Sequence, residues 1–98
     1  MTLQQGPGRD DAEAIALAAL AFLAGDGERL GRFLALTGLG PTEIRAGTGD
    51  PAFLAGVLDH LMRDETLMMV FAAEAGLTPD RVASAFQLLA GDRRVDGW

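Results

Sequence analysis

Asp64-Glu65-Thr66-Leu67-Met68-Met69-Val70-Phe71-Ala72-Ala73-Glu74-Ala75-Gly76 begins like a capped helix and then runs through seven apolar residues without a break. Asp64 is a favoured N-cap residue, Glu65 suits the positive end of the helix dipole, and Gly76 supplies the left-handed residue that commonly ends a helix. The helix of about residues 64–75 is apolar nearly all round, which is typical of a helix covered on most sides. The stretch therefore predicts the central helix of an all-α fold.

Further helices are predicted on both sides of this stretch, at about residues 10–24, 28–37, 41–46, 51–63 and 79–90. The clearest boundary is Asp50-Pro51, an N-cap residue followed by proline at the first helical position. Asp10 or Asp11 is expected to cap the first helix, and Gly91 to end the last. We therefore predict a compact five- or six-helix orthogonal bundle in a single helical domain, residues 10–91, between a flexible N-terminal arm, residues 1–9, and a polar C-terminal tail, residues 92–98, that includes Trp98.

The chain also resembles itself at a shift of 38 residues. The shift aligns Phe33 with Phe71 and Gly38 with Gly76, and a proline follows three positions after each glycine. Helices joined by Gly and Pro can look alike without a common origin. A duplication into two three-helix units and a chance similarity both stay open.

Composition narrows the range of partners and locations. The 98 residues include no Cys, which excludes disulfides and Cys-ligated metals, and the net charge of −6 disfavours attraction to phosphate backbones or anionic lipid. The longest apolar run, residues 14–24, is shorter than the roughly 20 residues that span a bilayer. Acidic residues precede it, the wrong sign for a signal peptide. We therefore expect a cytoplasmic protein without a membrane partner.

The sequence holds little that suits catalysis or cofactor binding. It has no Lys, Tyr or Cys, and its one histidine, His60, lacks the partners of a metal site or a catalytic triad. We predict no enzyme, no catalytic residue, no cofactor and no metal. His60 is expected to be exposed, on the polar side of its helix beside Asp59. Glu74, near the end of its helix, either pairs with an arginine or points to solvent, and both interpretations stay open.

Two helices have more apolar surface than polar surface, and an exposed apolar patch usually marks a contact site. The leading hypothesis is a non-enzymatic module that binds another protein or a second copy of itself. The expected contact surface consists of one side of the first helix and one side of the apolar helix, formed by Ala14, Ala18, Ala21, Met69, Ala72 and Ala73. The competing interpretation is that neighbouring helices cover both sides.

Two other functions fit parts of the pattern. Residues 71–86 have the shape of a DNA-binding helix-turn-helix, whose second helix would present Asp80, Arg81, Ser84 and Gln87. One arginine beside an aspartate, on an acidic chain, is poorly suited to phosphates, so nucleic acid is not the favoured partner. A carrier of a small apolar ligand, held in a Met- and Phe-lined cavity between helices, is the second alternative.

Three runs of sequence, residues 29–39, 50–54 and 71–77, resemble a family of short alphaproteobacterial helical proteins of unknown function. The resemblance spans about residues 11–90. It implies a helical domain of about this length, with no assigned activity, cofactor or catalytic residue.

Overall fold

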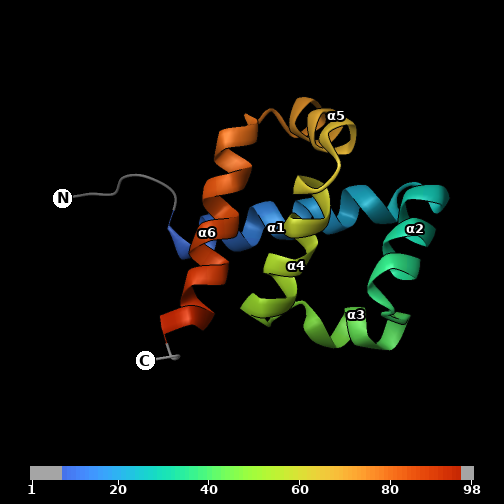
Figure 1. Ribbon diagram of the computed structural model, residues 1–98, viewed down its shortest axis with the longest axis horizontal. Helices are drawn as coiled ribbons and strands as arrows, with labels where there is room; N and C mark the ends of the chain where they lie inside the picture. Colours follow the sequence, from blue (N-terminus) through green and yellow to red (C-terminus); the bar gives the residue numbers. More distant parts are fainter. Residues whose placement is uncertain (1–7, 96–98) are drawn as a thin grey trace.

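The computed structural model describes residues 8–95, with side chains described for residues 8–91, and over this range it forms six helices and no strand. The helices are α1 (Arg9–Ala24), α2 (Gly27–Thr37), α3 (Pro41–Gly47), α4 (Pro51–Met62), α5 (Glu65–Ala75) and α6 (Pro79–Val95). In Figure 1, α1 crosses α4 and α6, and α2 and α3 continue around one end of the molecule. The prediction of a compact all-α bundle is confirmed.

The core lies where α1, α4 and α6 pack against one another. Its fully buried large side chains are mostly leucine and valine from these three helices, joined by Phe33 of α2 and Phe71 of α5: Leu23, Leu54, Val57, Leu58, Leu61, Val82, Leu89, Phe33 and Phe71. The packing follows the amphipathic patterns of α4 and α6, whose large apolar residues recur at helical spacing.

The apolar helix does not occupy the predicted central place. α5 lies at one edge of the bundle, at the top of Figure 1, and its buried residues are Met68, Phe71 and Ala72. The physical reason is side-chain size. Part of the apolar surface of α5 comes from alanines, which lose little hydrophobic free energy when they face water. The helix can therefore bury one side and leave the other open.

Aspartate caps position the helices, as the sequence predicts. The Asp50 carboxylate accepts a hydrogen bond from the Ala52 N–H at 2.9 Å, and Pro51 follows at the first helical position. The Asp64 carboxylate accepts from the Leu67 N–H at 3.1 Å at the start of α5. Each cap satisfies a backbone donor that the helix leaves unpaired.

Two boundaries differ from the prediction. α1 begins at Arg9 with Gly8 at the N-cap, so Asp10 and Asp11 lie in the first turn, where they stabilise the helix through its dipole. α6 continues through Gly91 to Val95, because a glycine inside a helix costs only about 1 kcal/mol relative to alanine. The polar tail is therefore helical over residues 92–95. Residues 1–7 of the predicted arm, and residues 96–98 with Trp98, lie outside the described range.

The residues that begin and end helices recur at a shift of 38 residues, but the packing of the helices does not. Gly38 and Gly76 both adopt left-handed backbone, with φ of 75° and 70°, and Asp26 and Asp64 each cap the helix that follows. α6, however, packs along α4, whereas α3 is a short helix that does not pack along α1. At this shift α2 coincides with α5, but α1 begins earlier than α4 and α3 ends earlier than α6, so the halves are not equivalent three-helix units. A common origin stays a prediction.

Two glycine substitutions are expected to change stability in opposite directions. Gly76→Ala should lower the free energy of unfolding by about 1–2 kcal/mol, because an L side chain is strained in the left-handed region. Gly31→Ala, inside α2 with open space around its Cβ position, should raise it by about 0.5–1 kcal/mol. Urea unfolding of both variants measures the difference. Changes of the same sign would contradict the backbone geometry at Gly76.

Candidate functional site

The predicted contact residues of α1 lie on its outer side. Ala14, Ala18 and Ala21 are exposed, together with Leu17, which keeps 41% of its surface accessible. The four follow one another at helical spacing (i, i+3, i+4, i+7), so they form a continuous apolar stripe. Nothing in the described part of the chain covers this stripe.

Of the three predicted contact residues on α5, two are exposed and one is buried. Met69 is 54% exposed and Ala73 is exposed, so both face outward. Ala72 is only 4% exposed and faces the core beside Phe71, which corrects its assignment to the surface. It lies one turn after Met68 on the inner side of the helix, and residues at this spacing share a face. We call Ala14, Leu17, Ala18, Ala21, Met69 and Ala73 the apolar surface.

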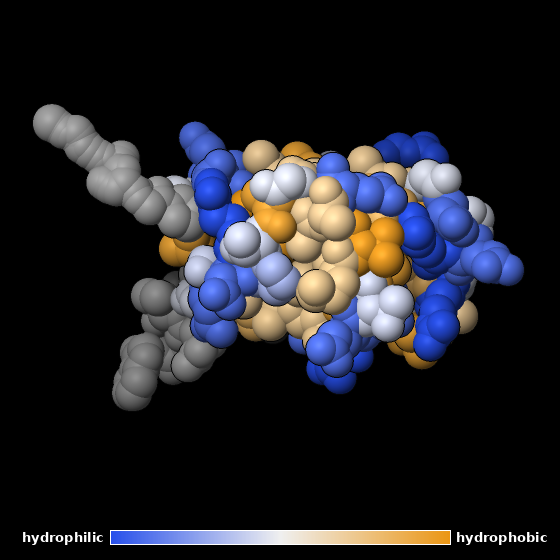
Figure 2. All heavy atoms as spheres, turned by 90° about the horizontal axis from the view of Figure 1, so that it is seen from above, coloured by the Kyte–Doolittle hydropathy of each residue, from blue (hydrophilic) through white to orange (hydrophobic). Residues whose placement is uncertain are grey.

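Helices α1 and α5 are in contact, but not through the side of α5 that carries Met69 and Ala73, since each of these residues lies two positions from Phe71 and so about 200° around the helix. The rings of Phe22 on α1 and Phe71 on α5 pack with centroids 5.3 Å apart. A shallow hollow of about 200 Å³ lies over this contact, lined by Ala18, Phe22, Phe71, Glu74 and Ala75. Figure 2 shows apolar side chains gathered in the middle of the face that α5 forms, with charged residues toward both ends.

Glu74 stands at the edge of the shallow hollow. It is exposed, and among the described residues no hydrogen bond or ion pair joins it to an arginine. Of the two interpretations left open by the sequence, the solvent-facing one holds. Glu74 therefore adds a negative charge beside the apolar surface.

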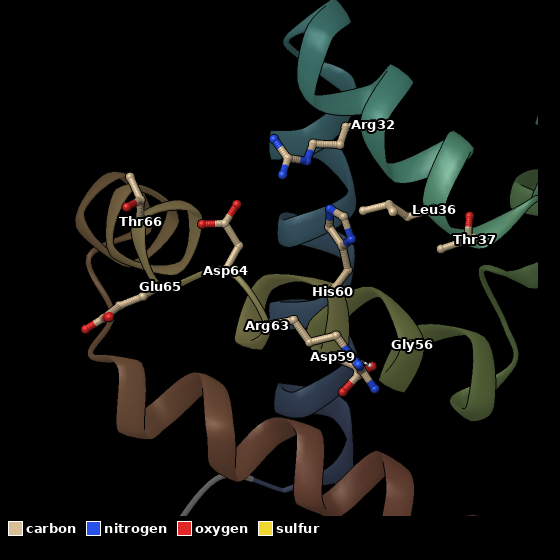
Figure 3. A pocket seen from close by; sticks show the side chains of 10 residues that line it. All are labelled: Arg32, Leu36, Thr37, Gly56, Asp59, His60, Arg63, Asp64, Glu65 and Thr66. Atoms are coloured by element: carbon tan, nitrogen blue, oxygen red, sulfur yellow. Dashed lines mark hydrogen bonds and ion pairs between the residues drawn. The ribbon is translucent and has the colours of Figure 1, made fainter.

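A second and larger hollow, of about 660 Å³, lies where α2, α4 and the start of α5 meet (Figure 3). We call it the histidine hollow. Its lining is mostly polar and charged, and consists of Arg32, Leu36, Thr37, Gly56, Asp59, His60, Arg63, Asp64, Glu65 and Thr66. The Arg63 guanidinium donates to the Asp59 carboxylate at 2.7 Å along one edge, so these two charges neutralise each other.

His60 is buried, contrary to the expectation of an exposed residue. It is 9% exposed, and its imidazole meets the Phe33 ring edge-on with centroids 5.1 Å apart. Its Nε2 atom has no hydrogen-bond partner in the described part of the chain. The sequence pattern missed this because α4 is covered over a wider arc than an ordinary surface helix, and α2 supplies the cover.

Burial also determines the charge of His60. Desolvation lowers the pKa of the imidazole from its ordinary value of 6.5, and the Arg32 cation lowers it further, against the opposing effect of Asp64 and Asp59. His60 is therefore neutral at neutral pH. One ring nitrogen can donate a hydrogen bond and the other can accept one.

The geometry bears on both alternative functions. The carrier hypothesis requires a cavity lined by methionine and phenylalanine. Methionine lines neither of the two hollows, and phenylalanine lines only the shallow one, so neither hollow matches that description. The DNA-binding hypothesis relies on the second helix of the predicted helix-turn-helix, which would present Asp80, Arg81, Ser84 and Gln87. Arg81 is the one cation among these four, and it donates to the Asp11 carboxylate at 2.6 Å, which neutralises its charge. Among the side chains of residues 8–91 no group of acidic residues and histidine is arranged to hold a metal ion. No helix within residues 8–95 has the length and hydropathy to cross a bilayer.

Comparison with known proteins gives a family but no activity. Neither the curated proteins nor the solved structures contain a match to this chain. The family described as "Protein of unknown function (DUF3572)" matches residues 9–92, which is nearly the whole described domain. The resemblance to a short family of unknown function is thereby confirmed, and the chain belongs to the DUF3572 family.

Proposed function

We propose that this domain is a non-enzymatic protein–protein interaction module of the cytoplasm, and that the apolar surface is its contact site. The observation that supports the proposal is the stripe on α1. A surface helix normally presents polar residues to water, but the outer side of α1 presents Ala14, Leu17, Ala18 and Ala21 at the spacing of a packed face. A partner helix can approach such small residues closely.

The surface has the composition of an interface centre with a charged edge. Met69 and Leu17 are flexible or bulky apolar groups that gain most from burial, and methionine adapts to partners of different shape. Glu74 and the acidic first turn of α1 lie on the same two helices. Because the chain has a net charge of −6, a second copy would be repelled, whereas a partner with basic residues around an apolar patch would be attracted.

Site-specific photocrosslinking tests the proposal even though the partner is unidentified. A photoreactive amino acid at position 69 in the native cell should yield a discrete crosslinked product with another protein, whereas a product with a second copy would mean that the chain associates with itself despite its net charge. The same group at Leu88, which is 40% exposed on α6 outside the apolar surface, serves as the matched control. A product absent at position 69, or equally abundant at position 88, would contradict the proposal.

Met69→Glu is expected to abolish that association while leaving the fold intact. The side chain already faces water, so the free energy of unfolding should change by no more than about 0.5 kcal/mol. A charge in the centre of an apolar contact, by contrast, would be buried without a partner. Recovery of the tagged complex, compared with Leu88→Glu, measures the first effect, and urea unfolding measures the second. A large loss of stability would show that Met69 belongs to the core.

A further inference from the structure

The histidine hollow contains a polar group that the proposed interaction surface does not use. His60 is more than nine-tenths buried, and its Nε2 atom has no partner within the described residues. A buried nitrogen left without a hydrogen bond is destabilising, and such groups in native proteins usually have a structural or functional reason. Figure 3 shows the imidazole at the floor of the hollow, directed toward α2 between Arg32 and Leu36.

The walls of the hollow have opposite charge. On the α2 side, the Arg32 guanidinium has no hydrogen bond or ion pair with any described residue. On the α5 side are Asp64 and Glu65. Asp64 uses Oδ1 to cap α5, and its other carboxylate oxygen has no hydrogen-bond partner within residues 8–91. Arg32 and Asp64 reach from opposite sides toward the space above His60 (Figure 3).

An apolar contact completes the lining. Leu36 is 68% exposed, the most exposed large apolar side chain among the described residues, and it stands on α2 one turn after Arg32. Opposite it, Gly56 leaves open space where a side chain would otherwise project. The volume of about 660 Å³ lies within the range of about 300–1,000 Å³ found for small-molecule sites.

We propose that the histidine hollow binds a small zwitterion of the α-amino-acid type with an apolar side chain. Its carboxylate would pair with the Arg32 guanidinium, which holds carboxylates in a planar geometry. Its ammonium group would pair with Asp64, and its apolar side chain would lie against Leu36. The neutral imidazole of His60 would lie beneath the bound carboxylate. A simple anion would meet the two acidic residues, and a simple cation would meet Arg32, so a ligand with both charges fits best.

The single histidine makes the test direct, because its imidazole signals in an NMR spectrum belong to one residue. Titration with L-leucine should shift these signals saturably. N-acetyl-L-leucine, which lacks the cation, and L-leucinamide, which lacks the anion, should each bind at least about tenfold more weakly, the factor that a loss of 1.4 kcal/mol produces. No saturable shift with L-leucine, or equal binding of N-acetyl-L-leucine, would overturn the proposal.

Matched variants assign the effect to the hollow. Arg32→Gln should weaken L-leucine binding at least about tenfold. Arg45→Gln, an exposed arginine on α3 outside the hollow, should leave it unchanged. Gly56→Leu, which places a side chain in the hollow from α4, should abolish the shift while the protein stays folded by circular dichroism. Binding that survives both Arg32→Gln and Gly56→Leu would place the ligand elsewhere and overturn the assignment.

Discussion

Replacement of Leu58 by alanine is expected to lower the free energy of unfolding by about 2–5 kcal/mol, a large part of the 5–15 kcal/mol typical of a small domain. Leu58 is fully buried in α4, which packs against both α1 and α6. Truncation removes its transfer free energy and leaves a cavity that three rigid helices cannot close. Equilibrium urea unfolding measures the change, and the variant should unfold at a much lower denaturant concentration.

Leu67→Ala provides the matched comparison, because it deletes the same atoms from α5. Leu67 is only partly buried, and α5 lies at the edge of the bundle. Its truncation should therefore cost less than half as much as that of Leu58, since water already reaches part of the side chain. Equal costs at the two positions would mean that α5 is as central as α4, and would contradict its place at the edge.

The helix boundaries could be predicted because short-range interactions determine them. Asp50, Asp64 and Gly76 act within one turn of their own position, through a side-chain cap or a left-handed backbone. Such signals are readable from neighbours in the sequence. Gly91 shows their limit, since a glycine that ends one helix is tolerated inside another when the following residues continue it.

The position of α5 could not be predicted, because it depends on which helices cross. Counting apolar residues predicts that Ala73 and Met69 are both buried. Exposure of an alanine costs little hydrophobic free energy, however, and Met69 is left exposed as well. The large residues of α4, such as Leu54 and Leu58, pack against α1 and α6 instead. Side-chain size would have been a better guide than the fraction of apolar residues.

The two sites differ in how far the sequence revealed them. The exposed stripe of α1 is local, so helical spacing was enough to find Ala14, Ala18 and Ala21. The histidine hollow combines residues 32–37 with residues 56–66, which only the fold brings together. The one available signal was the sole histidine with four charged residues, Asp59, Arg63, Asp64 and Glu65, close to it in the chain. Those charged neighbours indicated an exposed, polar environment for His60. Its ring is buried because it packs against Phe33, which is distant in the sequence.

Acidification is expected to destabilise the protein through His60. The pKa of this histidine is below 6.5 in the folded state, chiefly because of burial, and near 6.5 in the unfolded chain. At neutral pH both states hold a neutral imidazole, so the group has no effect on stability there. As the pH falls through 6.5, the unfolded chain binds the proton first, and the free energy of unfolding decreases until the folded pKa is reached.

His60→Leu isolates this effect, because the two proteins share every other titrating group. Leucine is close to histidine in volume and removes the unpaired Nε2 atom, so the variant should be at least as stable as the parent chain at neutral pH. The difference in unfolding free energy between the parent and the variant should move in favour of the variant below pH 6.5, by at most about 1.4 kcal/mol per pH unit. Urea unfolding at a series of pH values measures it. A difference that moves the other way would mean that Asp64 and Asp59 outweigh burial and raise the pKa, and a difference that does not change with pH would mean that the imidazole is solvated in the folded protein.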